Sequence, residues 1–122
     1  MKIQNQDQDL AIILLSENLC HLILDLSSKF PVFLRHSLVS RIDQTILDLI
    51  MYLNSARFED DQNRLNSLKN ADTSLNFLRL LLRISFTRKL ISVGALENVT
   101  LKINEIGKML HGWIKATQNK MV

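Results

Sequence analysis

The chain is poor in the residues that interrupt regular structure. Its 122 residues include one proline and three glycines, whereas Leu, Ile, Asn, Lys and Arg are abundant. That composition is typical of long helices joined by few turns. A chain of this length fits one domain, and a hydrophobic content of 47% is ample for a core. We therefore expect an all-α fold in which residues 1–122 form a single domain.

Cysteine is nearly absent, and long hydrophobic runs are absent too. Cys20 is the single cysteine, which excludes a disulfide framework within the chain and agrees with a reducing compartment. The longest uninterrupted apolar runs, such as residues 10–15, are far shorter than the ~20 residues that cross a bilayer. The N-terminal segment MKIQNQDQD carries acids and lacks the small-residue cleavage site of a secretory signal. We therefore expect a cytoplasmic protein that does not enter a membrane.

The sequence also lacks the patterns from which catalytic and metal sites are built. It contains no glycine-rich phosphate loop and no nucleophile motif. Cys20 and His21 point about 100° apart on a helix, and no Cys or His follows at metal-ligand spacing, so both are interpreted as packing residues. The acids at positions 7, 9, 60 and 61 are interpreted as helix-start charges. We expect no catalytic residue, no metal and no cofactor.

Negative charge is scarce in the second half of the chain. Residues 1–72 carry seven Lys or Arg against ten Asp or Glu, whereas residues 73–122 carry eight against two. A basic half without many aromatic residues suits the phosphates of a polyanion better than stacked bases. Nucleic acid is the leading partner of this kind, and an acidic protein surface is the alternative.

Hydrophobic periodicity and turn signals predict four helices. Pro31 disfavours helix at Phe30 and separates a helix over about 9–27 from one over about 34–56. Asp60 is suited to cap a third helix over about 61–90, and Ser92-Val93-Gly94 separates it from a fourth over about 96–118. Because the connections are short, we expect an up-down-up-down four-helix bundle.

The third predicted helix is apolar around most of its circumference. Leu75, Leu78 and Leu82 form one apolar seam, and further apolar residues surround the rest, namely Phe77, Leu80, Leu81 and Ile84. A bundle on its own would leave some of them exposed to water. A helix of this kind is usually buried on more than one side, so we expect a homo-oligomer.

Two segments carry the most specific pattern, residues 71–83 (ADTSLNFLRLLLR) and residues 105–115 (EIGKMLHGWIK). In the first, polar residues form one narrow stripe on an apolar helix. Together the segments resemble the accessory variability determinant (Avd) proteins of diversity-generating retroelements. The resemblance covers residues 30–115 and is strongest after residue 70, and its elements are Ala71-Asp72, Leu75, Leu78-Arg79, Leu82-Arg83 and residues 106–115.

Members of that family are small four-helix bundles that assemble as a pentameric barrel. They bind the reverse transcriptase and the template RNA of the element and support mutagenic synthesis of complementary DNA. The resemblance therefore implies a homopentamer and a non-catalytic accessory role with those two partners. A related group of four-helix proteins, encoded within intervening sequences of ribosomal RNA genes, shares the architecture. A structural or protein-interaction bundle of that kind is the alternative.

Arg79 and Arg83 are the first candidates for binding RNA or the polymerase. They lie one helical turn apart and are the arginines matched in the family pattern. The alternative is a structural ion pair with Asp72 or with a carboxylate of a partner subunit. A second basic stripe on the last helix comprises Lys108, His111 and Lys115, which could also be merely solvated. The positive area extends, with less specificity, to Arg64, Lys69, Arg88 and Lys89.

Gly107 and Gly112 require compensation, because glycine in a helix interior costs about 1 kcal/mol relative to alanine. We expect close approach of another helix or of a partner chain at both. Trp113 lies on the apolar arc of its helix, which favours a core position over a base-stacking platform. The expected residues of core or oligomer packing are thus Leu75, Leu78, Leu82, Gly107, Gly112 and Trp113.

Overall fold

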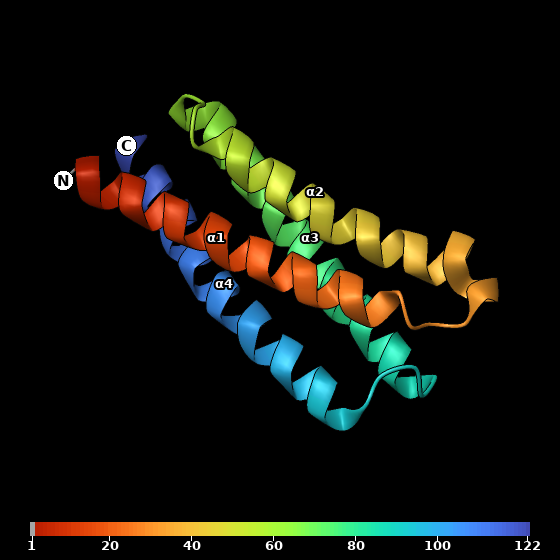
Figure 1. Cartoon of the computed structure of the whole chain (residues 1–122). Coiled ribbons are helices and arrows are strands. Elements are labelled where there is room, and N and C mark those ends of the chain that lie inside the picture. The colour runs from red at the N-terminus through yellow and green to blue at the C-terminus, as the bar shows by residue number, and fades with distance from the viewer. Residues whose placement is uncertain (1) are drawn as a thin grey trace.

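The chain folds into long α-helices. A computed structural model describes the backbone of residues 2–122 and the side chains of residues 8–122. Within that range the α-helices are α1 (Lys2–Ser27), α2 (Ser40–Ala56), α3 (Asp61–Thr87) and α4 (Val93–Lys120). Two short helical segments, η1 (Val32–Leu34) and η2 (Arg35–Val39), precede α2 (Figure 1). The prediction of an all-α fold with four helices is confirmed for this part of the chain.

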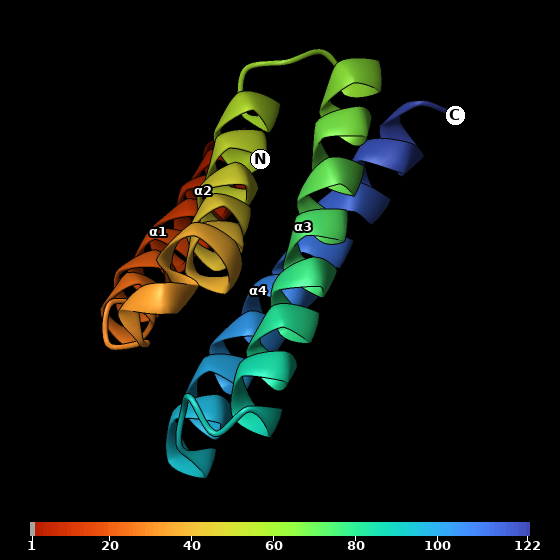
Figure 2. The same cartoon turned by 90° about the vertical axis from the view of Figure 1, so that its right-hand side faces the viewer.

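The four helices form an antiparallel bundle. Each helix packs against the next along the chain, and α4 packs back against α1. Seen from the side, α1 and α2 form one half of the bundle and α3 and α4 the other (Figure 2). One end of the bundle holds both chain termini and the α2–α3 connection (Figure 1). Residues far apart in the sequence, near the start of α1 and the end of α4, are therefore neighbours.

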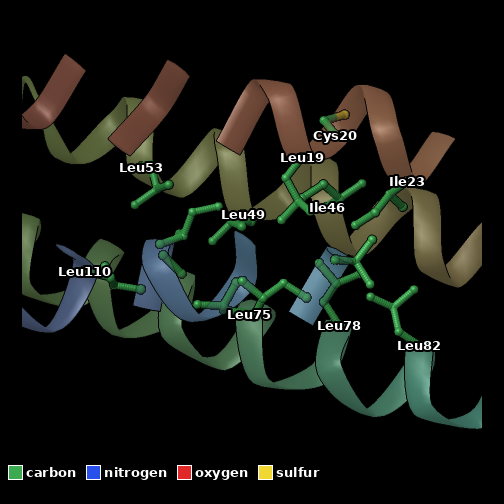
Figure 3. Close-up of a cluster of buried hydrophobic side chains, with 14 of the residues drawn as sticks. Leu19, Cys20, Ile23, Ile46, Leu49, Leu53, Leu75, Leu78, Leu82 and Leu110 are labelled. Carbon is green, nitrogen blue, oxygen red and sulfur yellow. The ribbon is translucent and has the colours of Figure 1, made fainter. Parts of the chain in front are cut away.

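A core of aliphatic side chains holds the bundle together. Leu75, Leu78 and Leu82 of α3 are buried, and they point toward leucines and isoleucines of the other three helices (Figure 3). Fully buried residues that contribute from α1, α2 and α4 are Leu19, Ile23, Ile46, Leu49, Leu53, Ile106 and Leu110. Burial of a leucine or isoleucine side chain contributes about 1.5–3 kcal/mol each, so this cluster is the main source of stability.

The connection between α1 and α2 differs from the prediction. Regular α-helix resumes at Ser40 rather than near residue 34, after one 3₁₀ turn and one π turn. Pro31 has φ −53° and ψ 142°, which is extended backbone and ends the helical path of α1. Leu38 and Val39 still pack against the core from the π turn. Spacings of three and four residues around Leu38 therefore did not distinguish a π turn from an α-helix.

Side-chain caps explain where α3 and α4 begin, and a left-handed residue explains where α3 ends. The Asp60 carboxylate accepts a hydrogen bond from the Asn63 N–H at 2.9 Å, as expected of a cap. Ser92 caps α4 by accepting from the Ala95 N–H at 3.1 Å, so α4 begins at Val93 and not near residue 96. The expected end of α3 at residue 90 is also wrong, because Lys89 adopts the left-handed conformation with φ 64° and the helix stops at Thr87.

The N-terminal helix starts earlier than predicted. Since α1 begins at Lys2, Asp9 lies about two turns inside the helix and is not a helix-start charge. The side chain of Asp7 lies outside the described residues. By length and composition alone, the Gln8–Ser27 part of α1 is apolar enough to cross a membrane, which the short uninterrupted runs did not suggest. A core helix passes the same test, and Ile12, Leu19 and Ile23 are buried in this one.

The outer apolar side chains of α3 are only partly exposed. Leu81 is buried, and the Phe77 ring lies under the Arg41 guanidinium of α2, whose carbon is 5.2 Å from the ring centroid. Leu80 and Ile84 are each 39% exposed. Exposed apolar residues also occur on α1, at Leu10 and Leu14. Exposed apolar side chains therefore do not distinguish α3 from α1.

Candidate nucleic-acid interface

The polar stripe of α3 lies along the seam with α4. Arg79 is half-buried, and its guanidinium donates a hydrogen bond to the side-chain oxygen of Asn104 on α4. The same guanidinium lies over Gly107, where an added Cβ would come within 3.3 Å of Nη2 and 3.6 Å of Leu75 Cδ2. A side chain at position 107 would crowd Arg79. Glycine here thus permits the arginine to lie against α4.

A second contact crosses the same seam. His111 Nε2 lies 3.1 Å from the Asp72 carboxylate, and the histidine side chain is 68% exposed. The carboxylate of Asp72 therefore pairs with α4 and not with Arg79 or Arg83. Among residues 8–122, the guanidinium of Arg83 makes no side-chain hydrogen bond or ion pair and is exposed. The structural pairing of these arginines with Asp72 is therefore not seen, and a pair with a carboxylate of a partner subunit stays an alternative.

These contacts bring the two basic stripes onto one surface. Antiparallel packing places the stripe of α3 beside the stripe of α4, with the Arg79–Asn104 and Asp72–His111 contacts between them. We call this the α3–α4 surface and define it by Lys69, Asp72, Arg79, Arg83, Lys108, His111 and Lys115. Lys69, Arg83, Lys108 and Lys115 are exposed, and Asp72 is the single carboxylate in the set. Such a surface can neutralise phosphate groups of a nucleic-acid backbone.

Arg64 does not belong to this surface. Its Nε donates to the carbonyl oxygen of Ala56 at 2.7 Å, and its Nη1 lies 3.4 Å from the Asp61 carboxylate. The last carbonyls of a helix lack partners within the helix, so Arg64 satisfies the C-terminus of α2. Its assignment to nucleic-acid binding on charge alone took no account of this role.

Trp113 packs against the core as expected, whereas no other helix of the chain approaches Gly112 closely. Apart from its chain neighbours and the backbone of its own helix, nothing described comes within 4 Å of a Cβ added at Gly112, and the expected approach of a partner chain there stays a prediction. Trp113 is half-buried and lines a cavity of about 500 Å³ at the end of the bundle that holds the termini. Charged residues that also line it are Asp9, Arg57, Arg64 and Lys120. No local sequence pattern connects these residues with one another.

Asp9 is the unusual group in this cavity. Burial raises the pKa of its carboxyl above the ordinary 3.8, and the opposing effects of Arg64, Arg57 and Lys120 do not cancel the increase. The sequence contained a usable signal, because Asp9 precedes Ile12, Ile13 and Ser16 by three, four and seven residues. That spacing places the acid on the buried face of α1.

The remaining candidates for chemistry are isolated. No group of three or more His, Cys, Asp or Glu side chains that could hold a metal ion occurs in the described part of the chain. Cys20 is buried, and this burial raises the pKa of its thiol, with further increases from Asp43 and Glu17. His21 is exposed, so its interpretation as a packing residue is wrong.

Comparison with known protein families agrees with the fold. A family model described as bAvd-like matches residues 2–117, which is nearly the whole chain. A search of curated proteins finds no match.

Proposed function

Because the chain belongs to the bAvd-like family, we propose that it is the non-catalytic accessory protein of a diversity-generating retroelement. In this role it binds the reverse transcriptase and the template RNA of the element and supports mutagenic synthesis of complementary DNA. The α3–α4 surface contacts RNA or polymerase, and the bundle acts as a scaffold that fixes where the two lie relative to each other.

The single observation that carries the RNA-binding part is the merging of the two basic stripes across the α3–α4 seam. Arg83, Lys108 and Lys115 are exposed there, and Arg79 is held in place by Asn104. Neutralising phosphates with such cations releases counterions, so the affinity should fall steeply as salt rises. Backbone contacts of this kind position the RNA without reading its sequence.

Homopentameric assembly is part of the same proposal. The exposed apolar side chains of α3, Leu80 and Ile84, provide surface that a neighbouring subunit would cover. A ring of subunits would repeat the α3–α4 surface around an axis. Repetition would multiply weak phosphate contacts along one RNA molecule.

Light scattering on the purified protein tests assembly, and its repetition with the native polymerase and template RNA at low and moderate salt tests binding. We expect five subunits and a complex that dissociates as salt rises. The Arg79→Ala/Arg83→Ala protein should keep its oligomeric mass and bind RNA or polymerase more weakly. The matched control is Lys29→Ala/Arg35→Ala, which removes two exposed cations at the α1–α2 connection.

A monomer or dimer that ignores both partners would contradict the proposal and leave a structural or protein-interaction bundle. Loss of assembly in the Arg79→Ala/Arg83→Ala protein would assign these arginines a structural role. Equal weakening of binding by the control pair would show that net charge, and not the α3–α4 surface, determines binding.

A further inference from the structure

The cavity beside Trp113 has the size and lining of a ligand site. Its volume of about 500 Å³ lies within the range of about 300–1,000 Å³ typical of small-molecule pockets. It lies among the start of α1, the end of α4 and the turn between α2 and α3 (Figure 1), and none of the cations that define the α3–α4 surface lines it. We call it the end pocket. The function proposed above makes no use of it.

The apolar part of the end pocket consists of Ile12, Met109 and Trp113. Gly112 is adjacent to the tryptophan and also lines the pocket, and a Cβ at that position would meet nothing within 4 Å. The missing side chain leaves open space next to the indole. A flat ring system of a ligand could occupy this space and pack against Trp113.

The polar part of the end pocket combines one acid with several cations. Asp9 is half-buried, and its carboxylate makes no hydrogen bond or ion pair with any other residue among 8–122. Because Asp9 lines the pocket and is only half-buried, its carboxylate can accept hydrogen bonds from a ligand donor. Three lining residues are cationic, Arg57, Arg64 and Lys120, and they give the described lining a positive balance.

The cations are not equally free. Arg64 is fixed by its hydrogen bond to the Ala56 carbonyl at 2.7 Å, so it contributes charge at a set position. The Arg57 guanidinium carbon lies 5.2 Å from the centroid of the Phe58 ring. Lys120 is exposed at the end of α4. Arg57 and Lys120 can therefore turn toward an anionic group at the mouth of the pocket.

A ligand that fits must offer a flat ring, hydrogen-bond donors for the carboxylate and a negative charge. A guanine nucleotide meets all three conditions, since N1–H and the exocyclic amine lie on one edge and can donate to both oxygens of a carboxylate. Adenine and cytosine offer one exocyclic amine, and uracil flanks its single N–H with carbonyl oxygens that would repel Asp9. A cationic ligand such as an arginine side chain would be repelled by three cations.

We propose that the end pocket binds the base of an unpaired guanine nucleotide, with the ring against Trp113, the Watson–Crick edge on Asp9 and the phosphate on Arg57 and Lys120. Unpaired bases in RNA are commonly stacked on aromatic side chains and read at this edge. The chemistry of the pocket stands on its own, and only the assignment of the guanine to template RNA rests on the proposed function.

The single tryptophan of the chain makes the test direct. Titration of the purified protein with GMP should quench Trp113 fluorescence to saturation. IMP, which lacks the exocyclic amine, should bind at least about fivefold more weakly, and UMP more weakly still. Asp9→Asn should weaken GMP binding at least about fivefold and remove the preference over IMP, whereas Asp25→Asn, at an exposed acid of the same helix, should have no effect.

A second variant tests whether the ligand occupies the open space beside Trp113. Gly112→Leu should abolish saturable quenching by filling the gap beside the indole, while circular dichroism shows an intact helical fold. Isothermal titration calorimetry repeats the measurement without relying on fluorescence. Equal binding of GMP and UMP, or GMP binding that ignores both Asp9→Asn and Gly112→Leu, would overturn the proposal.

Two further arms identify the source of the guanine and separate the two proposals. An oligoribonucleotide with one unpaired guanine that binds more tightly than GTP points to RNA, and the reverse order points to a free nucleotide. Arg79→Ala/Arg83→Ala should reduce RNA binding and leave GMP binding unchanged. Failure of GMP binding with salt-sensitive RNA binding intact would remove the pocket proposal alone, and the opposite result would remove the proposed function alone.

Discussion

Arg79 lies over Gly107, so that a Cβ at position 107 would stand 3.3 Å from the arginine Nη2. This relationship distinguishes Gly107 from Gly112, the two glycines in the interior of α4. Replacement of a helical glycine by alanine gains about 1 kcal/mol of helix propensity. At Gly112 nothing opposes that gain, whereas at Gly107 the guanidinium that donates to Asn104 must give way by a few tenths of an ångström. We expect Gly112→Ala to stabilise the protein by about 1 kcal/mol and Gly107→Ala to stabilise it less.

Urea denaturation of both variants measures the difference, and the same pair in an Arg79→Ala background provides the control. Without the guanidinium, the two substitutions should become equivalent. Equal stabilisation at both positions in the presence of Arg79 would mean that the arginine moves at no cost.

Lys89 occupies a backbone conformation that favours glycine. Its φ of 64° costs a residue with a side chain about 1–2 kcal/mol, part of which glycine would lose again through its greater freedom in the unfolded chain. Lys89→Gly should therefore raise stability by up to about 1 kcal/mol in chemical denaturation. Lys108→Gly, inside α4, is the matched control and should lower stability by about the same amount. If Lys89→Gly lowers stability as Lys108→Gly does, the inference that the backbone at Lys89 is strained is wrong.

Lys89 also marks a limit to how far the sequence could predict the fold. Buried positions such as Leu75 and Leu78 follow from helical spacing, and Asp60 marks the start of α3 by its chemistry. The end of α3 was missed because a lysine stands where the usual signal is glycine. The π turn at η2 was missed because local spacing does not reveal how the backbone is wound.

Some features of the candidate site could likewise be predicted from the sequence, and others depend on how the helices pack. The stripe containing Arg79 and Arg83 is visible on one helix, because residues one turn apart share a face. Its neighbours across the seam, Asn104 and Gly107, depend on how α3 and α4 pack. The end pocket joins Asp9 to Lys120, at opposite ends of the sequence, and no local pattern links them.

Asp9 makes stability depend on pH in a predictable direction. Burial raises its pKa above 3.8 in the folded state, so the folded protein binds this proton more tightly than the unfolded chain does. The contribution of Asp9 to stability is therefore most favourable at low pH and declines as pH rises from about 3.8 through the folded pKa. Asp9→Asn should raise the melting temperature at pH 7, and the difference should shrink as the pH is lowered.

Melting curves of both proteins between pH 3 and pH 8 test this expectation. Asp25→Asn shows whether replacement of any acid on α1 has the same effect. If Asp9→Asn lowers the melting temperature at neutral pH, the three nearby cations outweigh burial and the carboxylate stabilises the fold.

Leu78 and Leu80 are two residues apart on α3 and should respond differently to truncation. Leu78 is fully buried, so Leu78→Ala should cost about 2–5 kcal/mol of stability. Leu80 is 39% exposed in the isolated chain, and Leu80→Ala should cost less than about 1 kcal/mol there.

If α3 packs against a neighbouring subunit as proposed, a charge at Leu80 must break that contact. We expect Leu80→Glu/Ile84→Glu to keep its helical circular dichroism and to lose oligomeric mass in light scattering. Leu101→Glu, at a 70% exposed leucine of α4, is the control for an added surface charge. An unchanged mass for the Leu80/Ile84 double variant would show that subunits meet through another face, and then the exposed leucines of α1 would be the next surface to substitute.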